Sequence, residues 1–108
     1  MDRMPRKDML LSMLAEEPED VFFNYALALE FISENKLNDA EEQFLKTIKI
    51  NSEYLPCYYQ LAQTLEKLDK KNEALEYYKK GLELAKKQKN QKAIGEINEA
   101  LEMLNDEL

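Results

Sequence analysis

Residues 24–50 read NYALALEFISENKLNDAEEQFLKTIKI, and residues 58–84 read YYQLAQTLEKLDKKNEALEYYKKGLEL. The second stretch repeats the first after 34 residues without a gap, and 8 of the 27 aligned pairs are identical. Unrelated sequences of ordinary composition would share about two. The identical pairs join Tyr25 to Tyr59, Leu27 to Leu61, Ala28 to Ala62, Lys36 to Lys70, Asn38 to Asn72, Ala40 to Ala74, Glu42 to Glu76 and Lys46 to Lys80. A repeat of this length predicts a stacked helical array, a class whose members mostly bind other proteins.

Composition and charge limit the class of partner. The chain has 108 residues, enough for one domain, and its 15 Lys and Arg against 22 Asp and Glu give a net charge of −7. Because an acidic chain repels phosphate groups, we expect neither nucleic acid nor a membrane surface as a partner. No stretch approaches the roughly 20 apolar residues of a membrane span.

The cysteine content and the N-terminal stretch bear on the compartment. The single cysteine, Cys57, cannot form an internal disulfide, which is typical of a reducing compartment. The apolar run Met9–Ala15 is interrupted by Ser12 and has no small-residue cleavage pattern, so we expect no signal peptide. A cytoplasmic location is the simplest prediction.

The low content of helix breakers predicts sustained helix. The chain has only 2 glycines and 3 prolines, and Ala, Leu, Glu, Lys and Gln dominate. We expect about six helices and no strands. The helices are predicted to cover residues 5–16, 18 or 19 to 34, 38–50, 55–68, 72–88 and a last segment after residue 90. Glu19 and Asp20 are expected in the first turn of the second helix. Asn38 and its repeat equivalent Asn72 are predicted to cap the helices that they begin.

The last helix carries one apolar stripe on an otherwise polar rod. Its apolar residues recur at spacings of three and four: Ile94, Ile97, Leu101, Leu104 and Leu108. We interpret the stripe as a cap over the preceding hairpin, because a terminal repeat needs one wet face. The alternative is a coiled-coil contact with another chain.

These features resemble the tetratricopeptide repeat, a helix-turn-helix unit of 34 residues. Its pattern of large and small residues falls in the first repeat on Asn24, Leu27, Ala28, Phe31, Ala40 and Phe44, and in the second on Tyr58, Leu61, Ala62, Leu65, Ala74 and Tyr78. The resemblance implies an all-α array of helical hairpins, an alpha-alpha superhelix. It predicts one domain over residues 1–108, with an N-terminal helix in 1–18, repeats in 21–54 and 55–88, and a capping helix in 89–108.

The resemblance also implies a binding surface, because the first helices of such repeats line a concave groove that takes extended peptides. Helical spacing assigns to this groove Phe22, Tyr25, Ala26 and Leu29 from the first repeat, and Tyr59, Gln60, Gln63 and Lys67 from the second. We expect the aromatic members to supply buried area and the polar members to hydrogen-bond a peptide backbone. The family's clamp for a chaperone's terminal carboxylate is not found at the matching positions, so an apolar or aromatic peptide suits this surface better.

Catalysis is not indicated. The chain has no histidine and no glycine-rich phosphate loop, and Cys57 has no imidazole to act as its base. Neighbouring carboxylates such as Glu41 and Glu42 point about 100° apart on a helix and stay solvated. We therefore expect no enzyme activity, no cofactor and no metal site.

The first helix of the first repeat is apolar on nearly every face, since only Asn24 and Glu30 are polar between Val21 and Ile32. Such a helix must be covered all round. The cover is the N-terminal helix, a bound partner segment, or a second copy of the chain. The N-terminal region offers four adaptable methionines, namely Met1, Met4, Met9 and Met13. The sequence thus predicts a non-catalytic interaction module, with a self-assembling homodimer as the alternative.

Overall fold

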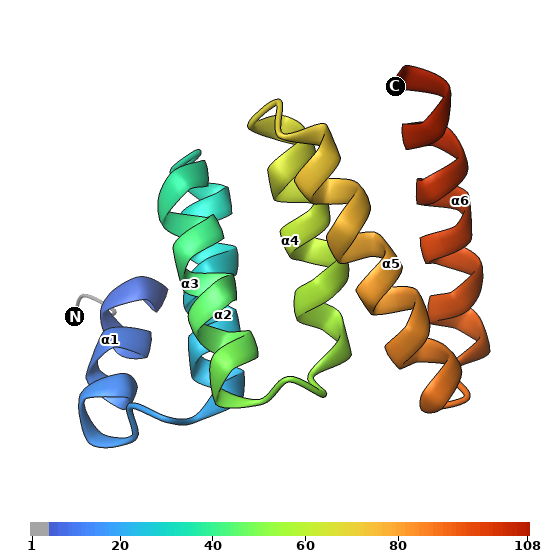
Figure 1. Ribbon diagram of the computed structural model, residues 1–108. Coiled ribbons are helices and arrows are strands. Elements are labelled where there is room, and N and C mark those ends of the chain that lie inside the picture. Colours follow the sequence, from blue (N-terminus) through green and yellow to red (C-terminus); the bar gives the residue numbers. More distant parts are fainter. Residues whose placement is uncertain (1–4) are drawn as a thin grey trace. The chain divides into compact units, whose positions relative to one another are not determined.

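The computed structural model describes residues 5–108, and all the regular structure in this range is α-helical (Figure 1), which confirms the all-α prediction. The helices are α1 (Arg6–Glu16), α2 (Val21–Ser33), α3 (Leu37–Ile50), α4 (Leu55–Lys67), α5 (Lys71–Lys87) and α6 (Gln91–Glu107). They fall into two compact units, unit 1 (Met1–Ser52) and unit 2 (Glu53–Leu108). None of the helices in the described range is long and apolar enough to cross a membrane. Met1 and Met4, two of the predicted covering residues, lie outside the described residues.

One turn recurs at the ends of α2, α4 and α5. Its central residue has a left-handed backbone in each case, Asn35 at φ 58°, Asp69 at φ 60° and Lys89 at φ 57°. In the first copy the Lys36 amide donates to the Phe31 carbonyl at 2.8 Å, and the Asn35 amide donates to the Ile32 carbonyl at 2.9 Å. This pair of bonds is the Schellman motif, which satisfies the last carbonyls of the helix.

The turn explains why the prediction that Asn38 and Asn72 cap helices was wrong. The Schellman motif is complete at Lys36 and at Lys70, so helical geometry resumes at the next residue. Helices α3 and α5 therefore begin one residue earlier than expected, and both asparagines lie inside the first turn. Neither N-cap residue forms a side-chain cap hydrogen bond.

Side-chain caps occur instead at α2 and α6. The Asp20 carboxylate accepts a hydrogen bond from the Phe23 amide at 2.8 Å, so Asp20 is the N-cap residue that precedes α2. The sequence had predicted Asp20 within the first turn of this helix. The Asn90 side chain accepts from the Ala93 amide at 3.0 Å and begins α6. Each cap satisfies one amide that the helix itself leaves without a partner.

In unit 1, α2 and α3 form a hairpin, and α1 lies against α2. Leu10 of α1 is buried, and the Lys7 ammonium lies 5.0 Å from the centre of the Phe31 ring and 3.0 Å from a Glu34 carboxylate oxygen. The N-terminal helix thus covers part of the apolar α2. Two methionines of the same helix, Met9 and Met13, remain 44% and 37% exposed.

A buried polar group occupies the first core position of the first repeat. Asn24 is fully buried, and its side-chain amide donates to the carbonyls of Pro18 at 3.0 Å and Asp20 at 2.7 Å. Its carbonyl oxygen accepts from the Gln43 side chain at 2.8 Å. Every hydrogen-bonding group of the amide that faces the core is satisfied, so the burial of Asn24 carries little desolvation cost.

In unit 2, α4 and α5 form the second hairpin, and α6 lies on α5. Gly81 permits the close packing of α5, because a Cβ atom there would lie 3.0 Å from the Tyr58 Cβ. Ile97 and Leu104 of α6 are buried, while Leu108 is exposed. These two residues of the apolar stripe of α6 therefore pack within unit 2, where α6 contacts α5.

Candidate functional site

An aromatic pair occupies the same place in both repeats. The ring centroids of Tyr59 on α4 and Tyr78 on α5 lie 6.0 Å apart with the ring planes at 68°. Their counterparts 34 residues earlier, Tyr25 on α2 and Phe44 on α3, lie 5.9 Å apart at 53°. The pair in unit 1 is tilted, whereas the pair in unit 2 is edge-to-face, an arrangement that is favourable because the positive edge of one ring meets the negative face of the other. We call Tyr59 and Tyr78 in unit 2 the tyrosine pair.

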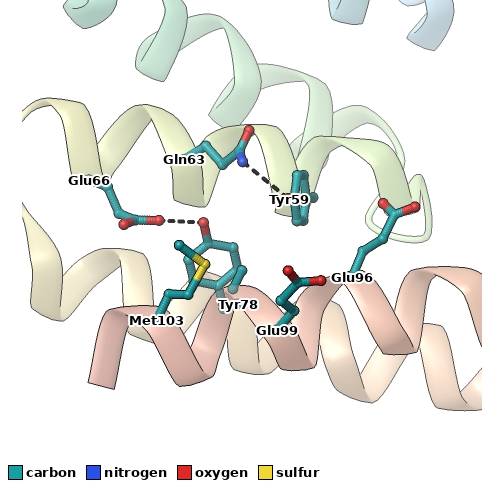
Figure 2. Close-up of a pocket in the computed structure, with 8 residues that line it drawn as sticks. Tyr59, Gln63, Glu66, Tyr78, Glu96, Glu99 and Met103 are labelled. Atoms are coloured by element: carbon teal, nitrogen blue, oxygen red, sulfur yellow. Dashed lines mark hydrogen bonds between the residues drawn. The ribbon is translucent and has the colours of Figure 1, made fainter. Parts of the chain in front are cut away.

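The tyrosine pair lines a pocket of about 330 Å³ within unit 2 (Figure 2). Side chains from α4 face those of α6 across it, with Glu66 and Glu96 at opposite ends and Glu99 between them. The lining residues are Tyr59, Gln63, Glu66, Tyr78, Glu96, Glu99, Ala100 and Met103. The pocket therefore combines aromatic, aliphatic and acidic groups, a mixture that suits an organic ligand.

Hydrogen bonds hold the two tyrosines. The Tyr78 hydroxyl donates to the Glu66 carboxylate, and the Gln63 side-chain amide donates to the Tyr59 hydroxyl at 3.1 Å, both within the pocket (Figure 2). Tyr78 is almost fully buried, whereas Tyr59 remains half-exposed. These hydrogen bonds thus hold both members of the tyrosine pair in place, while the Tyr59 ring stays accessible from the pocket.

The pocket is electrostatically negative. Burial raises the pKa of Tyr59, and the charges of Glu96, Glu99 and Glu66 raise that pKa further. Burial and the hydrogen bond to Glu66 likewise raise the pKa of Tyr78. Both tyrosines therefore stay neutral at pH 7, and the carboxylates set the local charge.

Few cations offset these carboxylates. Glu96 has a loose ion pair with Lys92 of the same helix, at 4.0 Å. Over residues 5–108, Glu66 and Glu99 form no ion pair with lysine or arginine. In the same range no three His, Cys, Asp or Glu side chains are close enough to hold a metal ion.

Two of the predicted groove residues, Tyr59 and Gln63, line the pocket. Gln60 is half-buried and Lys67 is exposed, and neither belongs to the lining. In unit 1, Phe22 is 58% exposed. The remaining predicted residues, Tyr25, Ala26 and Leu29, are half-buried. A groove that combines both units stays a prediction.

The sequence reasoning missed the other lining residues for two reasons. Glu66 follows Gln63 by three positions and Tyr59 by seven, so helical spacing alone could have added it to the same face. Tyr78 was interpreted only as core. The lining residues on α6 were not predicted, because the sequence of that helix was interpreted only through its apolar stripe. These residues are Glu96, Glu99, Ala100 and Met103.

Comparison with known proteins decides the family. The model of a family described as anaphase-promoting complex, cyclosome, subunit 3 matches residues 6–81, more than two thirds of the chain. The chain belongs to this family of tetratricopeptide-like repeats. A tetratricopeptide repeat domain protein from Salinibacter ruber is similar in structure, with a TM-score of 0.76 and 31% identity over 81% of this chain and 88% of that one. No curated protein matches the sequence.

Two further tetratricopeptide structures share the fold at lower identity. The TPR2B domain of yeast Sti1, in a complex with pHsp70, gives a TM-score of 0.88 at 16% identity over 94% of this chain and 82% of that one. The first TPR of Spaghetti (RPAP3), bound to the HSP90 peptide SRMEEVD, gives 0.71 at 22% identity over 88% and 76%. These likenesses concern the fold alone.

Proposed function

We propose that this tetratricopeptide repeat protein is a non-catalytic module that binds a protein or peptide segment along the first helices of its repeats. The observation that carries the proposal is the pocket beside α4. One side of this helix is buried through Leu61 and Leu65, whereas Tyr59 and Gln63 line an open cavity of about 330 Å³. An accessible aromatic ring beside an amide group is typical of peptide-binding surfaces.

Proteins of the same fold support the proposal. The Sti1 domain is in a complex with pHsp70 and the RPAP3 repeat is bound to an HSP90 peptide, so this fold holds peptides in other proteins. In this chain we assign the anchoring role to Phe22, Tyr25 and Tyr59. The assigned hydrogen-bonding groups for a peptide backbone are Gln60, Gln63 and Lys67.

A library of random heptapeptides displayed on phage tests the proposal. The immobilised protein is expected to retain peptides whose synthetic copies bind it in calorimetry, and a variant with Tyr25→Ala and Tyr59→Ala should bind them at least about tenfold more weakly. Tyr77→Ala is the matched control, because this tyrosine lies on α5 and outside the pocket lining. Circular dichroism checks that each variant is folded. Failure to retain any peptide, or equal affinity of the double variant, would rule out the proposal.

Self-association is the second candidate function, and exposed apolar side chains on α1 favour it. Met9, Leu11 and Met13 are 44%, 46% and 37% exposed. Phe22 at the start of α2 is 58% exposed, and such side chains are typical of surfaces that another chain covers. Light scattering coupled to gel filtration tests this candidate. A mass that rises with concentration supports a homodimer, and a monomer at high micromolar concentration excludes it.

A further inference from the structure

The pocket of unit 2 carries a negative charge that plays no part in the proposed peptide-binding function. Three carboxylates line it, and two of them, Glu66 and Glu99, have no ion-pair partner in the described part of the chain. No lysine or arginine is among the lining residues. A cationic group that entered the pocket would gain Coulomb energy from all three carboxylates, whereas an anionic group would be repelled.

The spacing of the carboxylates selects the kind of cation. Together they do not form a metal cluster, since no such cluster is found in residues 5–108. In Figure 2, Glu66 and Glu96 lie at opposite ends of the pocket, with Glu99 and Met103 between them. An elongated organic cation fits this arrangement, because its charged head can meet one or two carboxylates while its stem lies along the rest of the cavity.

The remaining walls suit such a stem and its head. Met103 is 65% exposed and, together with Ala100, supplies a flexible aliphatic surface. The Tyr59 ring offers an aromatic face to a cation. The same chain already places two of its own lysines over rings, since Lys7 lies 5.0 Å from the Phe31 ring centre and Lys80 lies 4.8 Å from that of Tyr77.

We propose that the pocket formed by the tyrosine pair and the carboxylates of α4 and α6 binds a lysine or arginine side chain of the partner peptide. The head group pairs with Glu99 and Glu96, and the stem lies between Tyr59 and Met103. This inference rests on the proposed function and names the partner chemistry that the pocket recognises. It makes the second repeat the part of the molecule that selects a basic residue.

Solution NMR of the full chain with labelled methionine methyl groups tests the pocket directly. The probes are the acetyl methylamides of lysine, arginine, norleucine and glutamate, where norleucine keeps an aliphatic stem without the charge. We expect the lysine and arginine probes to shift the Met103 methyl signal saturably, at concentrations at least about tenfold lower than norleucine requires. The glutamate probe should cause no shift, and added salt should weaken the response to the basic probes.

Matched variants separate the pocket from general acidity. The pair Glu96→Gln and Glu99→Gln should weaken the basic probes about tenfold. The control pair, Glu83→Gln and Glu102→Gln, removes the same charge from exposed positions outside the lining and should leave the affinity unchanged. Equal shifts with norleucine, no shift with any probe, or equal loss in both double variants would overturn the inference.

The outcome is distinguishable from that of the proposed function. The phage library tests whether any heptapeptide binds, and the sequences retained test the pocket. Enrichment of lysine or arginine, lost when Glu96 and Glu99 are replaced by glutamine, supports the inference. Binding peptides without that enrichment contradict the inference and leave the peptide-binding function intact. A library without binders removes the proposed function, whatever the small probes show.

Discussion

The first helices of the two repeats, α2 and α4, carry the same aromatic pair in different chemical surroundings. Tyr25 with Phe44 and Tyr59 with Tyr78 have nearly equal ring separations, 5.9 and 6.0 Å. Around them, Leu29 and Ile32 of the first repeat are replaced by Gln63 and Glu66 in the second. The two repeats thus share the packing geometry of the aromatic pair. The substitutions around this pair give the second repeat an acidic pocket where the first repeat has apolar side chains.

The two repeats also fill their first core position by different means. In the first repeat, Asn24 is buried and fully hydrogen-bonded. In the second repeat this position holds Tyr58, and Gly81 gives its side chain room. One repeat therefore satisfies a small polar group, and the other accommodates a large ring, so similar backbones result from different side-chain solutions.

The largest expected effect comes from the shared aromatic pair. Phe44→Ala should lower the free energy of unfolding by about 3–5 kcal/mol, because the ring is fully buried and its removal leaves a cavity. Phe22→Ala is the control, and its 58% exposure predicts a loss of under about 1 kcal/mol. Urea denaturation followed by circular dichroism measures both. Similar losses at the two positions would show that the pair is not the common core of the repeats.

The buried amide of the first repeat gives the next effect. Asn24→Ala should cost about 2–3 kcal/mol, since it removes the side-chain hydrogen bonds to the Pro18 and Asp20 carbonyls and to the Gln43 side chain within the core. Asn38→Ala, at an exposed position in the first turn of α3, should change stability by less than about 0.5 kcal/mol. If both variants unfold at the same urea concentration, the hydrogen-bond network does not stabilise the first repeat.

The two glycines of unit 2 should respond in opposite directions. Gly95→Ala has open space around the new methyl group and should stabilise α6 by about 1 kcal/mol through helix propensity. Gly81→Ala gains the same propensity, but its Cβ would lie 3.0 Å from the Tyr58 Cβ, so a net loss of about 1 kcal/mol is expected from overpacking. Melting temperatures of the two variants decide the matter, and a stabilised Gly81→Ala would contradict the packing account of Tyr58.

The smallest effect concerns the Tyr78 hydroxyl at alkaline pH. Tyr78→Phe should cost about 1 kcal/mol at pH 7, because the hydrogen bond to Glu66 is lost. The folded-state pKa of Tyr78 lies above its ordinary value, so the contribution of its hydroxyl is complete below about pH 10 and falls as the unfolded chain ionises above it. The stability of the wild type should therefore approach that of Tyr78→Phe between about pH 10 and 11.

Denaturant titrations over this pH range measure the difference between the two proteins. Tyr77→Phe is the control at the adjacent position, since Tyr77 lies outside the pocket lining. Curves for the wild type and Tyr78→Phe that stay parallel up to pH 11 would contradict the account of the Tyr78 pKa.

Helix positions followed from sequence more closely than helix ends. The apolar spacing and the rarity of glycine and proline predicted six helices close to those observed. The starts of α3 and α5 were misplaced, because left-handed residues such as Asn35 and Asp69 complete the preceding turn before the asparagines that were taken as caps. A cap depends on backbone geometry over several residues, and residue type alone does not specify it.

The candidate site was only half predictable. Tyr59 and Gln63 followed from helical spacing on one face of α4, whereas Glu96, Glu99 and Met103 belong to another helix and lie at least 33 residues away in the chain. Which side chains of α6 face α4 depends on how Ile97 and Leu104 seat that helix on α5. No local pattern contains that information.

The sequence by itself determined the repeat, the helices and the small residues that let paired helices approach, because these depend on spacing along one chain segment. Only the tertiary structure decided that Leu10 of α1 is buried while Met9 and Met13 stay exposed, and that three carboxylates gather around the tyrosine pair. Both results depend on the rotation of one helix against another. That rotation is set by the packing of side chains distant in sequence, and the charge of the pocket follows from it.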